Sequence, residues 1–390
     1  MKYAAASLLA LAACESPFTP VLGGGGTAAD QAFGAAHVRW FVPDEAGGWT
    51  MRPELAGPYV YFERDLELSP GGTVVNRAQL VALDRATGAE AWAQPIVTGE
   101  NAAVAGDVIG AVWGSLPMFD LATGAQLHVF RYGQVSLSGN VATDGERFYV
   151  LTHDGHALAV NPGQGTTRWD TDLAGAGTAT GFGVAVEGEA VAVTLKHFGS
   201  TAAPGDSGFV AVLDRGTGAV RWRAALGEGL DPGFTDPPTI AGGLVVTRGN
   251  HEVRAWDLRS GAPRWRFDAR GPGVTYGGSG LASCEGLVIA PTGNLDVVAL
   301  DAATGAVRWR VRAQDLGSLM SLDCSHGTVL ARGSRLSVFD ARSGARRASY
   351  PIRDPDDGRR EFMIAAVTRD ADFLYISTTY GFAKIDAPDR

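Results

Sequence analysis

The side chains whose types suit catalysis or metal binding are few and poorly grouped in the sequence. His153 and His156 are the only close histidine pair, and the turn predicted at Asp154-Gly155 would hold their rings apart. The acidic run at 354–357 lacks the spacing of a calcium-binding loop. No Gly-x-Ser-x-Gly motif orders a serine, a histidine and an aspartate for nucleophilic catalysis. We therefore expect no catalytic residue, no metal site and no cofactor-binding residue.

Two cysteines, Cys284 and Cys324, occupy equivalent places in neighbouring copies of a sequence repeat. Each precedes the aspartate of its copy, Asp301 or Asp340, by nearly the same number of residues. A disulfide needs Cα atoms within about 7 Å, and inner strands of adjacent repeats can stand farther apart than that. Two hypotheses stay open, a bridge formed in an oxidising compartment and two buried thiols.

The third cysteine belongs to an N-terminal targeting segment. Lys2 is followed by an apolar run over residues 4–13, the pattern of a secretory signal peptide. That run is too short to span a bilayer as a helix, which needs about 20 apolar residues. The sequence LAAC at 11–14 resembles the bacterial lipobox, and this resemblance implies that residues 1–13 are removed and that Cys14 carries lipid. An ordinary cleavable signal peptide with a chance cysteine is the alternative.

Residues 14–33 then comprise the lipidated cysteine and a linker. They contain two prolines and the four glycines at 23–26, a composition typical of a flexible coil. Acyl chains would tether the protein to a membrane without making it span one. This predicts a location on the periplasmic side of a bacterial envelope, at the outer membrane rather than the inner one. The inner membrane is the alternative location, because an acidic residue directly after the cysteine, here Glu15, retains some lipoproteins there.

The composition favours a β-rich protein with a large core. Of the 390 residues 53 are glycine, and each glycine inside a helix costs about 1 kcal/mol. A hydrophobic fraction of 45% is sufficient for a folded domain. The formal net charge of -9, without a long basic run, disfavours binding to nucleic acid.

A repeated motif, Asp-x-x-Thr/Ser-Gly-x-x-x-Trp, decides the fold. Its eight aspartate or asparagine anchors recur roughly every 40 residues, the period of a four-stranded propeller blade. The complete copies comprise Asp84, Gly88 and Trp92; Asp214, Gly218 and Trp222; Asp257, Gly261 and Trp265; and Asp301, Gly305 and Trp309. In the other copies His128 or Ala348 replaces the tryptophan, Asn161 replaces the aspartate, and the last copy reaches only Asp386.

Each residue type of the motif has a structural role in this interpretation. The aspartate accepts backbone hydrogen bonds in the turn between the third and fourth strands, where the glycine adopts a left-handed conformation. The tryptophan packs between neighbouring sheets, since one ligand could not contact tryptophans in separate blades. Arginines flank it, as Arg308 and Arg310 flank Trp309, and protect the outer strand from pairing with other chains.

The two ends of the repeat region complement each other. The segment 37–42, with Trp40 in the tryptophan position, is typical of a fourth strand without the three before it, whereas Asp386 lacks a following strand. We predict that these ends pair, because an open ring leaves two unpaired sheet edges. The sequence thus predicts an all-β fold, a single eight-bladed β-propeller over residues 34–390, closed by pairing of its N- and C-terminal strands.

The repeats, clearest between Ala299 and Trp309, resemble the tryptophan-docking repeats of the pyrroloquinoline-quinone-like (PQQ-like) propeller superfamily over the range 34–390. One branch, the quinoprotein dehydrogenases, binds the quinone and calcium and oxidises alcohols or sugars. Those enzymes are longer, and many carry adjacent cysteines, which this sequence lacks along with the haem motif Cys-x-x-Cys-His. A second branch, the BamB lipoproteins of the outer-membrane β-barrel assembly machinery, shares the lipobox, the linker and the blade number.

Resemblance to the second branch implies a monomeric, lipid-anchored scaffold for protein–protein interaction, acting in outer-membrane protein assembly without a cofactor. Its partners would be envelope proteins, which in that branch include the barrel-inserting subunit. The insertions at 66–78 and 196–207 are candidate binding loops, because loops on rigid scaffolds often carry binding sites; tolerated surface loops are the alternative. For the whole chain, the alternatives are a PQQ- and calcium-dependent quinoprotein dehydrogenase and a small-ligand sensor.

Overall fold

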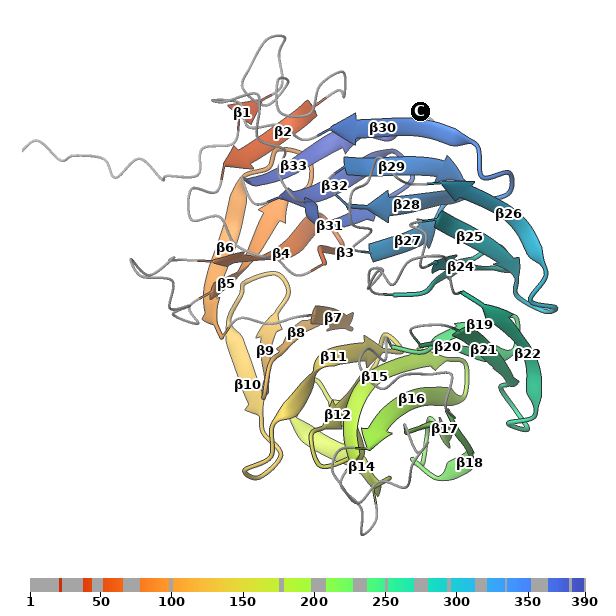
Figure 1. The fold of residues 1–390 in the computed structure, drawn as a ribbon. Coiled ribbons are helices and arrows are strands. Elements are labelled where there is room, and N and C mark those ends of the chain that lie inside the picture. The colour runs from red at the N-terminus through yellow and green to blue at the C-terminus, as the bar shows by residue number, and fades with distance from the viewer. Residues whose placement is uncertain are drawn as a thin grey trace, which may run out of the picture.

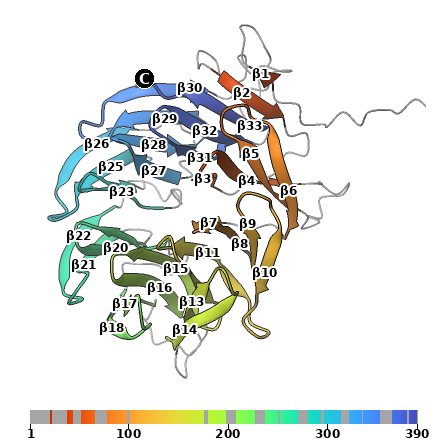
Figure 2. The same ribbon diagram turned by 180° about the vertical axis from the view of Figure 1, so that it is seen from behind.

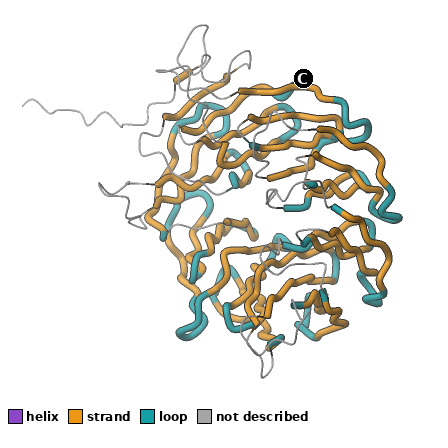
Figure 3. Tube along the Cα trace, viewed as in Figure 1, coloured by secondary structure: helices purple, strands orange, loops and turns teal. Residues whose placement is uncertain are grey.

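The residues that the structure describes form eight antiparallel sheets arranged in a ring around a central axis (Figure 1). Every regular element within them is a strand, and the view from behind shows the same ring (Figure 2). Strands and connecting turns account for the whole of this part of the chain (Figure 3). The predicted eight-bladed, all-β propeller is confirmed. The structure is a computed structural model and describes residues 21–22, 38–43, 52–65, 78–97, 101–174, 179–197, 208–226, 237–249, 252–269, 280–292, 296–312, 321–333, 335–351, 364–378 and 381–388.

In blades 1 to 4 the strands follow one another outwards from the axis. Blade 1 contains β3 (Glu54–Ala56), β4 (Tyr59–Asp65), β5 (Ala78–Asp84) and β6 (Glu90–Ile96). Blade 2 contains β7 (Asn101–Ala105), β8 (Val108–Val112), β9 (Leu116–Asp120) and β10 (Gln126–Phe130). Blade 3 contains β11 (Leu137–Thr143), β12 (Phe148–Thr152), β13 (His156–Asn161) and β14 (Thr166–Asp172). Blade 4 contains β15 (Ala179–Glu187), β16 (Ala190–His197), β17 (Phe209–Asp214) and β18 (Val220–Ala225).

Blades 5 to 7 repeat this order, and blade 8 combines both ends of the chain. Blade 5 contains β19 (Thr239–Ala241), β20 (Leu244–Arg248), β21 (Glu252–Asp257) and β22 (Pro263–Asp268). Blade 6 contains β23 (Ala282–Cys284), β24 (Leu287–Pro291), β25 (Asp296–Asp301) and β26 (Val307–Arg312). Blade 7 contains β27 (Ser321–Ser325), β28 (Thr328–Arg332), β29 (Arg335–Asp340) and β30 (Arg346–Pro351). Blade 8 contains β31 (Ile364–Arg369), β32 (Phe373–Thr378), β33 (Gly381–Asp386), β2 (Val38–Pro43) and β1 (Val21–Leu22).

The sequence of each strand follows from its place between the neighbouring blades. The second and third strands are covered on both faces, so β24 and β25 have nearly continuous apolar sequences, LVIAP and DVVALD. The outer β26 has the sequence VRWRVR, in which Trp309 alone is buried. Apolar side chains of facing sheets form a separate core at each junction between blades, as Val246 of blade 5 does with Val288 and Leu300 of blade 6.

The ring closes in blade 8, where the two ends of the repeat region meet. β2 pairs antiparallel with β33, with Trp40 opposite Lys384, and the same sheet continues through β32 to β31. The predicted closure is therefore confirmed. Within the predicted linker, β1 adds a short fifth strand outside β2, with Val21 opposite Phe41. No described segment is a helix with the length and apolarity needed to cross a membrane.

A tryptophan on the outer strand of one blade packs against the glycine turn of the next blade. The indole Nε1 of Trp309 donates a 2.7 Å hydrogen bond to the carbonyl oxygen of Ala341, and its ring lies over Gly344. A Cβ at Gly344 would lie 2.7 Å from that ring, and its φ of 71° is left-handed, so the position requires glycine twice over. The same contact pairs Trp40, Trp92, Trp169, Trp222 and Trp265 with Gly88, Gly124, Gly218, Gly261 and Gly305.

Two described junctions between blades depart from this arrangement, as the degenerate repeats predict. Between blades 2 and 3 the smaller ring of His128 lies over Gly165, with its Nε2 3.2 Å from the carbonyl oxygen of Gly163. Between blades 7 and 8 the tryptophan position is Ala348, which lies opposite Val338. The glycine position after Asp386 is Arg390, so both partners of the contact are absent from this junction in the sequence.

We expect Trp309→Ala to lower the free energy of unfolding by about 3 kcal/mol, because it empties a buried site between two sheets. Urea denaturation measures the change. Trp113→Ala is the matched control: Trp113 is 43% exposed, so its truncation should cost less than about 1 kcal/mol. Equal losses in the two variants would contradict the structural role assigned to the docking tryptophans.

Candidate functional site

The two faces of the ring differ in what the strands place on them. One face, here called the turn face, carries the turns between first and second strands and between third and fourth strands. The opposite loop face carries the connections between second and third strands and between successive blades. All residues of the repeat motif lie at the turn face or on the outer strands, and they are held there by one another.

The motif aspartates accept hydrogen bonds from the backbone and hydroxyl groups of their own turns, as Asp84, Asp120 and Asp301 do. Asp301 Oδ1 accepts hydrogen bonds from the backbone N and the Oγ1 of Thr304, at 2.9 and 2.8 Å. Arg308 Nη2 contacts Asp301 Oδ2 at 2.6 Å. The Arg308 hydrogen bond, followed by those of Thr304, lowers the pKa of Asp301 to about 2. The carboxylate of Asp301 therefore stabilises its turn in the ionised form.

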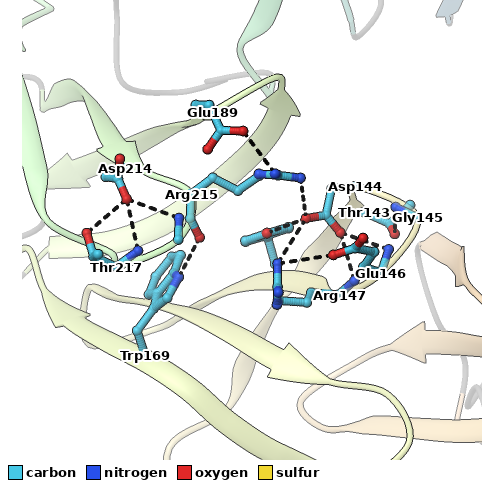
Figure 4. A network of polar contacts seen from close by, with 12 residues as sticks. Thr143, Asp144, Gly145, Glu146, Arg147, Trp169, Glu189, Asp214, Arg215 and Thr217 are labelled. Carbon is cyan, nitrogen blue, oxygen red and sulfur yellow. Dashed lines mark hydrogen bonds and ion pairs between the residues drawn. The ribbon is translucent and has the colours of Figure 1, made fainter.

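An ion-pair network at the turn face links blades 3 and 4 (Figure 4). Arg215, which follows the anchor Asp214, donates to Asp144 Oδ2 and to Glu189 Oε1, each at 3.0 Å. Asp144 lies in the first turn of blade 3 and also accepts a 2.8 Å hydrogen bond from the hydroxyl of Tyr149. The carbonyl oxygen of Arg215 accepts the indole N–H of Trp169 at 2.9 Å. Arg215 therefore fastens blade 4 to blade 3 through both its backbone and its side chain.

The same arrangement recurs where blade 8 meets blade 1: the arginine after the anchor contacts an aspartate of the preceding blade. We call each of these two arrangements a clasp. Arg85 follows the anchor Asp84 and contacts Asp370, which also accepts a 3.0 Å hydrogen bond from the hydroxyl of Tyr375. The Arg85 carbonyl oxygen accepts hydrogen bonds from Trp40 Nε1 at 3.2 Å and from Lys384 Nζ at 2.7 Å. Our sequence analysis missed both clasps. The signal was present, since arginine follows the anchor in these two blades and Asp-x-x-x-x-Tyr occurs in the blade before each.

Close to the axis, acidic residues of blades 1 and 7 face each other across an arginine. Arg52 Nη2 donates to Asp323 Oδ1 at 3.1 Å, and the other oxygen of Asp323 is buried and accepts no hydrogen bond from the residues described. Burial raises the pKa of the Glu54 carboxyl to about 7; Arg52 opposes this shift and Asp323 adds to it. Glu54 therefore changes charge near neutral pH. Sequence analysis could not find this cluster, whose members lie in repeats far apart in the chain.

A disulfide joins the innermost strands of blades 6 and 7. Cys284 of β23 and Cys324 of β27 are bonded, with Cα atoms 5.6 Å apart. The first strands of neighbouring blades thus approach within the distance that a bridge needs, which the sequence alone left open. The bond crosses a junction between blades close to Asp323, so it stiffens the same inner region of the ring.

On the loop face, backbone hydrogen bonds join the connections of blades 2 and 3 into a platform, defined here as residues 113–115, 131–136 and 153–155. The nitrogen of Leu137 donates to the carbonyl of Gly114, and that of His153 donates to the carbonyl of Ser136, both at 3.0 Å. Trp113 projects from this platform with 43% of its surface exposed. A large ring on a fixed backbone is the kind of group that anchors a binding partner.

A cluster of polar side chains connects the platform residue Tyr132 to strands β13 and β14 of blade 3. The Tyr132 hydroxyl donates to Asp170 Oδ2 at 2.8 Å, and His156 Nδ1 lies 2.7 Å from Asp170 Oδ1 and 3.0 Å from the Tyr132 oxygen. Burial, followed by Asp170, raises the pKa of Tyr132 to about 12. The phenol therefore stays protonated and serves as a hydrogen-bond donor. Both contacts of the His156 Nδ1 are therefore made within this cluster.

Several predicted features fall wholly or mainly outside the described residues. These are Cys14, the acidic run at 354–357, and the insertions at 66–78 and 196–207 apart from Ala78, which begins β5, and 196–197, which end β16. Within the described ranges no group of three or more His, Cys, Asp and Glu side chains is arranged to hold a metal ion.

Comparison with known proteins places this frame among the PQQ-like propellers. Residues 36–202 and 206–389 match the family described as outer membrane protein assembly factor BamB. No curated protein sequence matches the chain significantly. Among solved structures, BamB from Moraxella catarrhalis is similar with a TM-score of 0.57 and 16% identity, over 86% of this chain and 93% of that one.

Two further structures share the fold at low identity. The computationally designed Ika8 protein has a TM-score of 0.67 and 12% identity, over 88% of this chain and 98% of its own. The quinohemoprotein alcohol dehydrogenase ADHIIG of Pseudomonas putida HK5 has a TM-score of 0.61 and 10% identity, over 88% of this chain and 76% of its own. At these identities the structural likeness establishes the fold alone.

We expect loss of the disulfide to lower the free energy of unfolding by up to about 4 kcal/mol, the entropic estimate for a sequence separation of 40 residues. Urea denaturation of the double variant Cys284→Ser/Cys324→Ser, against the oxidised protein, measures it. Adding a reductant should destabilise the unmodified protein to the same level and leave the double variant unchanged. Alkylation of both cysteines without prior reduction would show that the bridge does not form.

We expect Glu54 to make the protein less stable as the pH rises. Its pKa is about 7 in the folded state, against 4.5 ordinarily, so the unfolded chain releases this proton first and the free energy of unfolding falls between those pH values. Glu54→Gln should therefore raise the melting temperature relative to the unmodified protein at pH 8 more than at pH 4. Glu285→Gln, on the turn face, is the control. An increase in melting temperature that is the same at pH 4 and pH 8 would contradict the raised pKa of Glu54.

Proposed function

The chain belongs to the family of the outer membrane protein assembly factor BamB, and from this premise we propose that it is a non-enzymatic scaffold that binds other envelope proteins. In this proposal a lipid on Cys14 holds the ring at the periplasmic side of a membrane, preferentially the outer membrane. The barrel-inserting subunit of the assembly machinery is the proposed partner. The ring works passively, because a rigid frame offers the same surface to each partner while the lipid keeps it close to the machinery.

The observation that carries this proposal is the platform of blades 2 and 3. The docking tryptophans are tied to glycine turns, whereas Trp113 stands on the loop face with 43% of its surface exposed. Backbone hydrogen bonds through Gly114 and Ser136 fix the segments beneath it. A rigid aromatic side chain costs little conformational entropy on binding, which is why tryptophan is enriched among residues that dominate interface energies.

A quinoprotein dehydrogenase is the second candidate, favoured by the shared fold with a quinohemoprotein alcohol dehydrogenase. The two functions differ in ligand, so thermal melting separates them. Addition of PQQ with calcium should leave the melting temperature of a scaffold unchanged and raise that of a dehydrogenase by several degrees, because a ligand bound only by the folded state stabilises it. A marked rise would overturn the proposal.

We expect Trp113→Ala to weaken binding to the purified periplasmic region of the barrel-inserting subunit about thirtyfold, the effect typical of a dominant interface residue. Biolayer interferometry at a fixed salt concentration measures the affinity. Leu127→Ala is the matched control, because Leu127 is 41% exposed on β10 of the same blade but lies away from the platform. Its affinity should change less than about twofold. Absence of binding by the unmodified protein, or equal losses in the two variants, would refute the proposal.

A further inference from the structure

Positive charge is concentrated on one half of the outer wall of the ring. The outer strands of blades 4 to 7, here called the basic wall, are β18, β22, β26 and β30, which lie consecutively along the outside (Figure 1). Together they contain one acidic residue, Asp268, and the arginines 221, 223, 264, 266, 308, 310, 312, 346 and 347. The outer strands of the other four blades contain two arginines, Arg39 and Arg168, and three acids, Glu90, Asp170 and Asp172. This division occurs in a chain whose formal net charge is -9.

The anchor aspartates balance only part of this charge. Each blade of the basic wall has an ion pair between its anchor and the arginine seven residues later, such as Arg221 with Asp214 at 2.7 Å and Arg308 with Asp301 at 2.6 Å. Arg264 with Asp257 and Arg347 with Asp340 complete the set. Arg266 and Arg310 are exposed and make no ion pair within the described part of the chain. The wall therefore keeps an excess of positive charge after its internal pairs are formed.

Protection of sheet edges does not account for this distribution. A charge of either sign discourages pairing with another chain, and all eight blades expose an outer strand apart from the part of β2 that β1 covers. Edge protection would therefore place charges of mixed sign around the whole ring. The observed arginines share one sign and occupy four consecutive blades, as expected of a surface that meets an extended anionic partner.

The point where the chain enters the ring brings a membrane close to this wall. β1 pairs with β2 on the outside of blade 8, and β30 of blade 7 is the neighbouring outer strand. Cys14 lies seven residues before Val21 in the sequence, a distance of at most about 25 Å for an extended chain. A lipid on Cys14, which is part of the proposed function, thus holds the bilayer near blade 8. On its other side blade 8 adjoins β6 of blade 1, which carries Glu90 and no basic residue.

We propose that the basic wall binds the anionic phospholipid headgroups of the membrane to which the chain is anchored. Guanidinium groups form paired hydrogen bonds with phosphate oxygens. Val220 and Val307, which are 46% and 48% exposed among the arginines, add apolar contact with the interface. The wall supplies the second membrane signal that stabilises lipid anchoring, and it sets which side of the ring faces the bilayer.

Sedimentation with lipid vesicles tests the proposal. The experiment uses the mature-length chain with Cys14→Ser, so that the basic wall acts without covalently attached acyl chains. The chain should bind vesicles of phosphatidylcholine with phosphatidylglycerol, should not bind phosphatidylcholine alone, and should dissociate in about 1 M salt, where the screening length is about 3 Å. Arg266→Gln/Arg310→Gln should weaken binding by roughly tenfold or more, since each cation near a membrane surface contributes about fivefold.

Arg168→Gln is the matched control for the single variant Arg310→Gln, because each removes one charge from an exposed position on an outer strand, in blade 3 or blade 6. It should change vesicle affinity less than about twofold. Equal binding to neutral and anionic vesicles, or equal losses of vesicle affinity in Arg168→Gln and Arg310→Gln, would overturn the proposal. So would an Arg266→Gln/Arg310→Gln chain that keeps vesicle binding but loses the barrel-inserting subunit, which would identify a protein interface. Vesicle binding is measured without that subunit, so its failure leaves the proposed scaffold function standing.

Discussion

The contact between a tryptophan of one blade and the glycine turn of the next is the interaction on which the ring depends. A single blade leaves both faces of its middle strands uncovered, so it is stable only between two neighbours. The indole ring sets the spacing of those neighbours, and its N–H bonds the backbone of the turn that it covers. At the junction of blades 7 and 8 both partners are replaced, the tryptophan by Ala348 and the glycine by Arg390.

The junctions around blade 8 need interactions that the repeat does not supply. This sheet is assembled from two distant parts of the chain, so closing it costs the entropy of a very long loop. The additional contacts gather there: Arg39 pairs with Asp386 at 2.8 Å, Arg85 binds Asp370, and Arg52 reaches Asp323 of blade 7. The disulfide between Cys284 and Cys324 lies in the adjacent inner region. Closure is thus distributed over the outer strands, the turn face and the region near the axis.

The fold was predictable because it repeats, and the surface features were not because they do not. The motif around Asp301, Gly305 and Trp309 recurs at a fixed period, so periodicity alone gave the blades, their turns and the role of Trp40. The cluster of Glu54 and Asp323 depends on how the ring brings blades 1 and 7 together, which no local pattern encodes. Trp113 stands outside the repeat and looks in sequence like any other tryptophan. The arginines of the outer strands were visible in four successive repeats, and the closed ring turns this grouping into one arc of its outer wall.

Since this frame is shared by proteins as different as BamB and an alcohol dehydrogenase at 10–16% identity, function must reside in what each chain adds to it. Here the additions lie on different parts of the ring. The basic wall is centred on blades 5 and 6, whereas the platform with Trp113 belongs to blades 2 and 3 on the loop face. With the wall against lipid, the ring stands on its edge and the platform is turned away from the bilayer. A protein partner then has access to the exposed tryptophan without competing with headgroups, so the two proposed surfaces are compatible in a single orientation.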